Sequence, residues 1–316
     1  MNAPTRLAAY GVGLAVVLTG GWLVGERTDL GEVEPAVASH STHSSSQKGA
    51  AMEPMATTEE LPGGLQVSAS GYTLDLAPTG YRAGRREVGF RITGPDGEPV
   101  TEYERSHEKD LHLIAVRRDF SGFQHVHPSF DAATGTWSVE LDLSPGAWRV
   151  FADFVPAGGE GLTLGADLAV AGDAGAQRLP EPTRTATVGG FTVTVTGDLV
   201  TGEHSALDFE ISKGGEPVTD LEPYLGAYGH LVALREGDLA YLHVHPGGEP
   251  GDGVTSPGPT VDFGAEVPSS GRYHLFLDFK VDGVVHTAPL TLDAESTAAD
   301  AAKGAGEPAH SSDHRH

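Results

Sequence analysis

Histidine is the residue type whose spacing in this sequence points most directly to chemistry. The chain has 316 residues, 15 His and no Cys. Six histidines form the same sequence pattern twice, with spacings of 13 and then 2 residues: His112, His125 and His127, then His230, His243 and His245. Without thiolates, a metal must be held by imidazole, carboxylate or thioether groups. This histidine pattern predicts one metal site per copy. Copper or zinc is the expected ion, and Cu(II), Cu(I), Zn(II) and Ni(II) all remain open.

Two short strands joined by a turn would position each set of histidines. In the second copy, Gly237-Asp238 suits a two-residue hairpin turn, because glycine readily adopts positive φ. The cross-strand pairs in that register are Glu236–Leu239, Leu234–Tyr241, Val232–His243 and His230–His245. Their side chains share one face, where neighbours lie about 4.5–8 Å apart, so three imidazoles can converge on one ion. The first copy has equal separations around Asp119-Phe120, where a slightly longer loop is equally compatible.

Other side chains are candidates for the same sites. Asp153 and Asp278 occupy the same place in a repeated Phe-x-Asp-Phe strand, and either can ligate a metal or orient a histidine. The alternative is a structural aspartate that caps a loop. In the tails, His40, His43, Met52 and Met55 form a soft ligand set suited to copper capture, and the chain ends with His310, His314 and His316. The alternative for the tails is a solvated low-complexity segment.

The elements that carry the histidines belong to a duplicated unit. Residues 97–127 recur without a gap as 215–245, with 13 of 31 positions identical. Period-2 alternation with Gly and Pro punctuation predicts short strands in residues 63–172 and 187–293. We therefore expect an all-β fold of two tandem immunoglobulin-like or cupredoxin-like sandwiches, joined by a linker at 173–186.

The remaining segments indicate where the chain works. Residues 7–25 carry no charge and are long enough to span a bilayer, after a cytoplasmic stub at 1–6. The positive-inside rule then leaves residues 26–316 outside the plasma membrane, while a cleaved signal and a secreted protein remain the alternative. Residues 26–62 and 294–316 are expected to be disordered tails. The net charge of −24 excludes a nucleic-acid partner.

The strings HEKDLHLI at 107–114, QHVHP at 124–128, YLGAYGHLV at 224–232 and LHVHP at 242–246 carry a family resemblance. They resemble a group of actinobacterial secreted or membrane-anchored proteins described as heavy-metal-binding-domain proteins. The resemblance covers residues 7 to about 293. It implies an extracytoplasmic metal-handling role, supports the two His-x-His-Pro segments with His112 and His230, and leaves the metal open.

Three functions follow from these features. The first is a non-enzymatic protein that sequesters copper or zinc or delivers it to a transporter or chaperone. The second is a structural or adhesive pair of sandwiches in which the histidines only pack. The third is a cupin-like metalloenzyme, because His243, His245, Glu249 and His274 imitate that ligand order in the second copy. No nucleophile, phosphate loop or paired carboxylates indicate another enzyme class.

Overall fold

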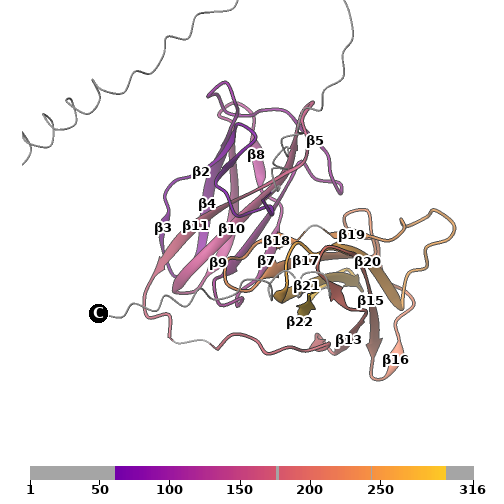
Figure 1. The fold of residues 1–316 in the computed structure, drawn as a ribbon. Helices are drawn as coiled ribbons and strands as arrows, with labels where there is room; N and C mark the ends of the chain where they lie inside the picture. Colours follow the sequence, from indigo (N-terminus) through magenta and orange to yellow (C-terminus); the bar gives the residue numbers. More distant parts are fainter. Residues whose placement is uncertain (1–60, 176–177, 243, 297–316) are drawn as a thin grey trace, which may run out of the picture. The chain divides into compact units, whose positions relative to one another are not determined.

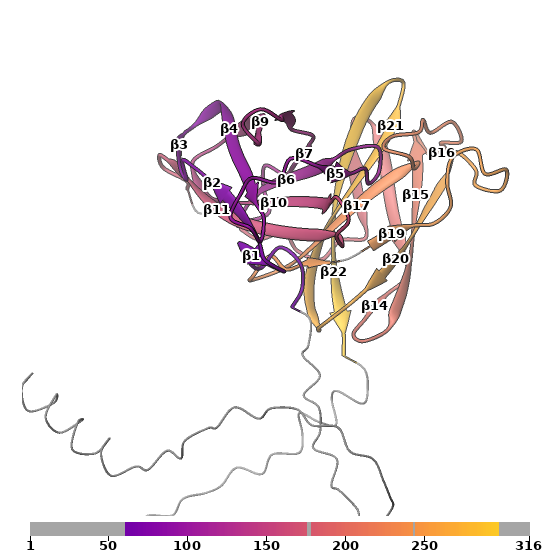
Figure 2. The same ribbon diagram turned by 90° about the horizontal axis from the view of Figure 1, so that it is seen from above.

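The computed structural model describes residues 61–175, 178–242 and 244–296. Over these ranges the chain consists of strands β1 to β22 and connecting loops, without a helix (Figures 1 and 2). The expected all-β fold is confirmed. No helix in the described ranges is long and apolar enough to cross a membrane. The predicted anchor at 7–25, the histidines and methionines of both tails and His243 lie outside the described residues.

The first repeat is built from two sheets. One has the strand order β1-β2-β4-β9-β8. Its strands are β1 (Ser68–Ala69), β2 (Tyr72–Leu76), β4 (Gly84–Thr93), β8 (Ser129–Asp131) and β9 (Thr136–Leu143). The other has the order β3-β11-β10-β6-β7, with β5 on β10. Its strands are β3 (Gly80–Arg82), β5 (Tyr103–Glu104), β6 (Leu111–Arg117), β7 (Gln124–Val126), β10 (Gly146–Pro156) and β11 (Leu162–Ala171).

The second repeat has the same layout. Its first sheet runs β12-β13-β15-β20-β19, with β16 on β15. These strands are β12 (Thr185–Val188), β13 (Phe191–Thr196), β15 (His204–Lys213), β16 (Glu216–Pro217), β19 (Val244–Pro246) and β20 (Thr260–Glu266). Its second sheet runs β14-β22-β21-β17-β18. These strands are β14 (Leu199–Val200), β17 (Gly229–Arg235), β18 (Tyr241–Leu242), β21 (Gly271–Val281) and β22 (Val284–Glu295). The strands of the second repeat therefore run from Thr185 to Glu295.

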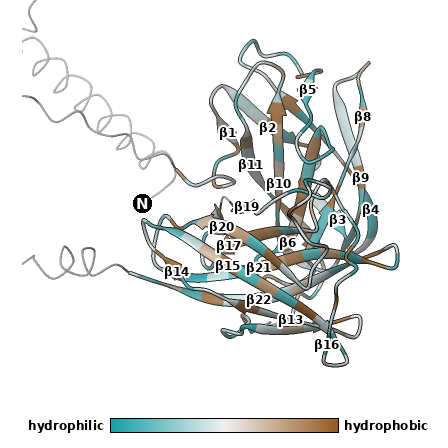
Figure 3. Cartoon of the chain, turned by 90° about the vertical axis from the view of Figure 1, so that its right-hand side faces the viewer, coloured by the Kyte–Doolittle hydropathy of each residue, from teal (hydrophilic) through white to brown (hydrophobic). Residues whose placement is uncertain are grey.

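Each repeat has its own hydrophobic core between its two sheets. Along β15, exposed and buried residues alternate, and Figure 3 shows the matching alternation of hydrophilic and hydrophobic residues. Side chains such as Leu113 and Trp148 form the core of the first repeat, and Phe209 and Tyr273 belong to that of the second. Two sheets packed face to face bury these apolar faces, which is the arrangement of a β-sandwich.

The opposite face of the histidine-bearing sheets is also buried. All seven residues of β6 are buried, which a sheet with one solvated face does not allow. A third apolar cluster explains this pattern, because it combines residues of both repeats. Its members are Ile114, Val116, Phe120, Phe151, Val232, Leu234, Leu239 and Phe276, with Phe123 and Tyr241 packed against them. Phe123 of the first repeat stacks on Phe276 of the second with ring centroids 4.0 Å apart.

The predicted register is confirmed near both turns. Ile114 pairs with His125 in the first repeat, and Leu234 pairs with Tyr241 in the second. The turn in the second repeat differs from a two-residue one: the Arg235 N–H donates to the Ala240 carbonyl, and Leu239 has a positive φ of 62°. The loop thus holds four residues without changing the register.

The predicted pairing of His230 with His245 is wrong. After β18 the chain leaves β17, and β19 joins the other sheet, where His245 lies opposite Gly264 of β20. On the other side of β17, His230 lies opposite Asp278 of β21. The alternation of side chains is the same for either partner strand, so the pattern alone did not distinguish them.

Candidate metal centre

Three histidines of the first repeat converge at the end of the β6–β7 hairpin. His112 Nδ1 lies 3.1 Å from His125 Nε2 and 3.2 Å from His127 Nε2. One ligand atom from each residue lies within 4.8 Å of the others, and this is the only such group of three among the described residues. Tetrahedral coordination with Zn–N bonds of 2.0–2.1 Å places ligand nitrogens about 3.3 Å apart. The observed separations are close to that value.

The far side of the His112 ring fixes its tautomer. Its Nε2 lies 3.0 Å from the carbonyl oxygen of Ser106, which can only accept a hydrogen bond. In the neutral ring Nε2 therefore carries the proton and Nδ1 presents its lone pair to the other two histidines. A backbone carbonyl that orients a ligand histidine in this way is common around metal ions.

An aspartate of the second repeat fixes the His125 ring. His125 Nδ1 lies 2.8 Å from Asp278 Oδ2, and the two side chains are only 5% and 3% exposed. Thr287 donates its hydroxyl proton to the other carboxylate oxygen of Asp278. Because the carboxylate accepts from Nδ1, the neutral His125 ring turns its bare Nε2 toward His112.

Burial keeps His112 and His127 neutral near pH 7. Desolvation lowers the pKa of His112 from the usual 6.5 to about 3, and it lowers the pKa of His127 to about 3. Neighbouring histidines lower both values further, since an imidazolium there would face a second positive charge. Neutral imidazoles are the form that binds metal ions, so neither ring has to release a proton near neutral pH.

His230 repeats the orientation of His112 but not its surroundings. Its Nε2 lies 2.9 Å from the carbonyl oxygen of Tyr224, just as His112 contacts Ser106 six residues before it. Its ring centroid lies 6.3 Å from that of His125, so His230 borders the cluster of the first repeat. Burial lowers the pKa of His230 to about 4. His230 thus lies beside the cluster of the first repeat, and the expected second site, which includes His243 outside the described residues, stays a prediction.

His107 belongs to this neighbourhood although it has no counterpart in the second repeat. Its ring centroid lies 5.2 Å from His230 and 6.1 Å from His112. Its backbone has a positive φ of 49°, and so has that of the next residue, Glu108, at 64°. Repeat symmetry missed His107, and the sequence carries no other signal for it.

Both candidate aspartates accept a hydrogen bond from a threonine of their own sheet, Asp153 from Thr163 and Asp278 from Thr287. Asp278 also reaches across to His125. Asp153 also lines the cavity beside the histidines. Asp278 thus has the geometry for the predicted orienting role, but the histidine that it contacts belongs to the other repeat.

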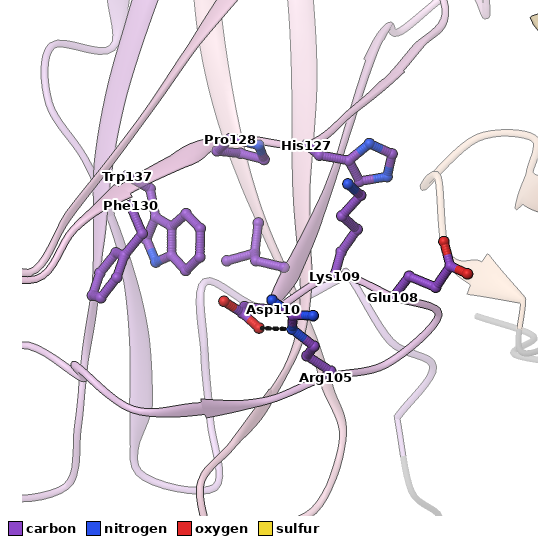
Figure 4. Close-up of a pocket in the computed structure, with 9 residues that line it drawn as sticks. Arg105, Glu108, Lys109, Asp110, His127, Pro128, Phe130 and Trp137 are labelled. Atoms are coloured by element: carbon purple, nitrogen blue, oxygen red, sulfur yellow. Dashed lines mark ion pairs between the residues drawn. The ribbon is translucent and has the colours of Figure 1, made fainter. Parts of the chain in front are cut away.

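Two cavities adjoin the histidine cluster. The larger, of about 270 Å³, has residues of both repeats on its walls, including His107, His112, His125, Asp153, His230 and His245. The smaller, of about 170 Å³, is lined by His127 together with Arg105 and Lys109. Figure 4 shows the Lys109 side chain reaching toward the His127 ring. The three converging nitrogens therefore lie between two spaces through which an ion or a further ligand can approach.

The ligand set of the cupin-like alternative is not gathered around one point in the described chain. His274 contacts Glu236 and Thr291 through its two nitrogens, at 3.0 and 3.1 Å. It lies four residues from Asp278 along β21, a separation of about 13 Å in a strand. His274 is thus held away from the cluster that borders Asp278.

The sequence profile of the domain of unknown function DUF8832 matches this chain twice, at residues 66–172 and 186–296. The chain belongs to the DUF8832 family. The two matches confirm the duplication inferred from the repeated histidine pattern, and each sandwich is one DUF8832 domain. No curated protein matches the chain.

Solved structures similar to the two DUF8832 domains align only loosely. Invasin, a bacterial integrin-binding protein, is 14% identical, with 73% of this chain and 41% of invasin covered and a TM-score of 0.23. The FN1–FN3 domains of chicken CNTN1 are 13% identical, with 75% and 70% covered and a TM-score of 0.20. A putative membrane anchored protein from Corynebacterium diphtheriae is 10% identical, with 72% and 60% covered and a TM-score of 0.22. The chain spans about two fifths of the length of invasin.

Proposed function

We propose that this protein binds one transition-metal ion, copper or zinc, through His112, His125 and His127, and that it sequesters or delivers the ion outside the plasma membrane. The observation that carries the proposal is the approach of three imidazole nitrogens, with His112 Nδ1 at 3.1 and 3.2 Å from the other two. Three neutral nitrogens without a thiolate suit Cu(II) and Zn(II).

A metal ion accounts for this arrangement better than a hydrogen bond does. The bare Nδ1 of His112 has one lone pair in the ring plane and accepts one good hydrogen bond. Two nitrogens approach it, and the Nδ1–H of His125 already donates to Asp278. A cation at the centre satisfies all three lone pairs at once.

The proposed location rests on the sequence. An uncharged segment at 7–25 suits a single membrane anchor with the sandwiches outside the cell. A three-histidine site also leaves a fourth coordination position, which a partner protein can fill when the ion is passed on.

Metal titration tests the proposal. The full chain is titrated with Cu(II) and Zn(II) by calorimetry, beside the triple variant H112A/H125A/H127A and the control His204→Ala, which removes an exposed histidine of β15. We expect the triple variant to lose one tight site and the control to keep it. Equal stoichiometry and affinity in all three proteins would refute the proposal, because the tails contribute equally to each.

A structural role for the histidines is the second candidate. The His125–Asp278 contact joins the two repeats, and a protonated His125 would donate from Nε2 to His112 without any metal. The protein would then be a rigid pair of sandwiches of the structural or adhesive kind. A chain that binds no metal, but whose repeats come apart in the variant His125→Ala, would favour this function.

A further inference from the structure

The contact between His125 and Asp278 crosses from one repeat to the other. The two residues are 153 positions apart in the chain, and both side chains are almost fully buried. Asp278 lies on β21, opposite His230 of β17, and Thr287 of β22 holds its other oxygen. The second repeat thus presents a fixed carboxylate to a ring of the first.

We propose that Asp278 is a positioning residue of the metal centre, so that the ion binds tightly only when the two repeats are docked. This inference rests on the proposed function and deepens it. The carboxylate keeps the proton of His125 on Nδ1 and thereby frees Nε2 for the ion. Without it, the ring is free to rotate or to carry its proton on Nε2, where it blocks coordination.

The duplication supplies an internal comparison. Asp153 occupies the position in the first repeat that Asp278 has in the second, since each lies opposite the first histidine of its own repeat. Each also accepts a hydrogen bond from a threonine on the neighbouring strand, Thr163 or Thr287. Asp278 also contacts His125 of the triad. The two aspartates are therefore matched in their place in the repeat and in their threonine partner.

Coupling of this kind works in both directions. If docking of the second repeat strengthens metal binding, then the bound ion must strengthen docking by the same free energy. The apolar cluster that surrounds Phe123 and Phe276 holds the repeats together without metal. The His125–Asp278 contact adds a contribution to the docking free energy that depends on the bound ion.

The test compares the variants D278A, D278N and D153A in the full chain. Two-bond ¹H–¹⁵N spectra of the metal-free, ¹⁵N-histidine-labelled protein report which nitrogen of His125 carries the proton. Zn(II) titration reports affinity. We expect D278A to lose the Nδ1–H tautomer and to bind Zn(II) about 10–100-fold more weakly. D153A should keep the tautomer and bind within about threefold of wild type. D278N conserves volume and a hydrogen-bond acceptor, so it should retain the tautomer and recover part of the affinity.

Two results would overturn the proposal. The first is a D278A protein that keeps the Nδ1–H tautomer and wild-type affinity. The second is an equal loss of affinity in D153A and D278A, which would indicate a general effect of removing a buried carboxylate. A wild-type chain that binds no metal refutes the proposed function instead, and the tautomer of the metal-free protein then still decides whether Asp278 orients His125.

Discussion

His125 and Asp278 lie 2.8 Å apart although they belong to different copies of one duplicated domain. In each copy, the aspartate lies opposite the first histidine of the same copy. The two copies meet through these faces, so an aspartate of one becomes a neighbour of a histidine of the other. The histidine cluster of the first copy thus includes a carboxylate of the second.

A single composite site predicts an asymmetric response to equivalent substitutions. His112→Ala removes the central nitrogen of the triad, and we expect it to weaken Zn(II) binding at least about 100-fold. His230→Ala removes the equivalent residue of the second repeat, whose ring lies 6.3 Å from His125, and it should weaken binding less than about tenfold. Calorimetry on both variants measures the difference. Equal losses would contradict a single site centred on His112.

The metal-free protein should lose stability as the pH falls below 6.5. Burial lowers the pKa of His112 to about 3, so the unfolded chain takes up a proton at this residue near pH 6.5 and the folded chain does not. The stabilising effect is complete above pH 6.5 and is lost as the pH falls toward 3. This residue alone should cost about 2 kcal/mol between pH 7.5 and 5.

Urea denaturation at the two pH values measures that loss, with metal removed by a chelator. The variant His112→Ala is the control, because its stability should vary with pH by about 2 kcal/mol less than that of wild type. The same dependence in both proteins would show that His112 is not buried in its neutral form.

The sequence was sufficient for the local geometry of the first histidine cluster. Alternation fixed which residues share a face, and the short turn fixed the register, so that Ile114 pairs with His125 as predicted. These are nearest-neighbour properties within one hairpin. His112, His125 and His127 converge as well, although β7 ends at Val126 and His127 follows it outside the strand.

The sequence was insufficient where a strand has a choice of partners. His245 continues the period-2 pattern of its hairpin, but its strand pairs with β20 of the other sheet. The sequence carries a weak indication that the two repeats pack against each other, but the period-2 alternation alone does not reveal it. Ile114 and Val232 are apolar on the face opposite the sandwich core, and a second apolar face indicates that something covers it. Nothing in the pattern identifies the cover as the other repeat.

Phe276→Ala should weaken the docking of the repeats without unfolding either core. Phe276 is 5% exposed and stacks on Phe123 of the first repeat, so its truncation removes packing worth about 3 kcal/mol at the apolar cluster between them. Amide hydrogen exchange should accelerate in β6 and β7. Phe209→Ala is the matched control, because Phe209 is buried within the core of the second repeat. It should destabilise that repeat and leave exchange in β6 unchanged. Acceleration of β6 exchange by both variants alike would contradict a specific role for Phe276.

Two glycine substitutions in the first repeat, Gly165→Ala and Gly80→Ala, should have different effects on stability. A Cβ atom on Gly165 would lie 2.0 Å from the carbonyl oxygen of Gly64, which accepts hydrogen bonds from the buried Arg149 guanidinium. The neighbouring Gly63 carbonyl accepts from the Tyr241 N–H of the second repeat, so this backbone joins the repeats. Gly165→Ala must displace it and should cost about 2 kcal/mol or more.

Gly80 is the control for this substitution, because a Cβ atom there would meet nothing within 4 Å. Gly80→Ala should change stability by less than about 0.5 kcal/mol, or raise it slightly, since alanine restricts the unfolded chain. Urea denaturation of both variants, with unchanged slopes, measures the contrast. A Gly165→Ala protein as stable as Gly80→Ala would mean that residues 63 and 64 are not held between Arg149 and Tyr241 in solution.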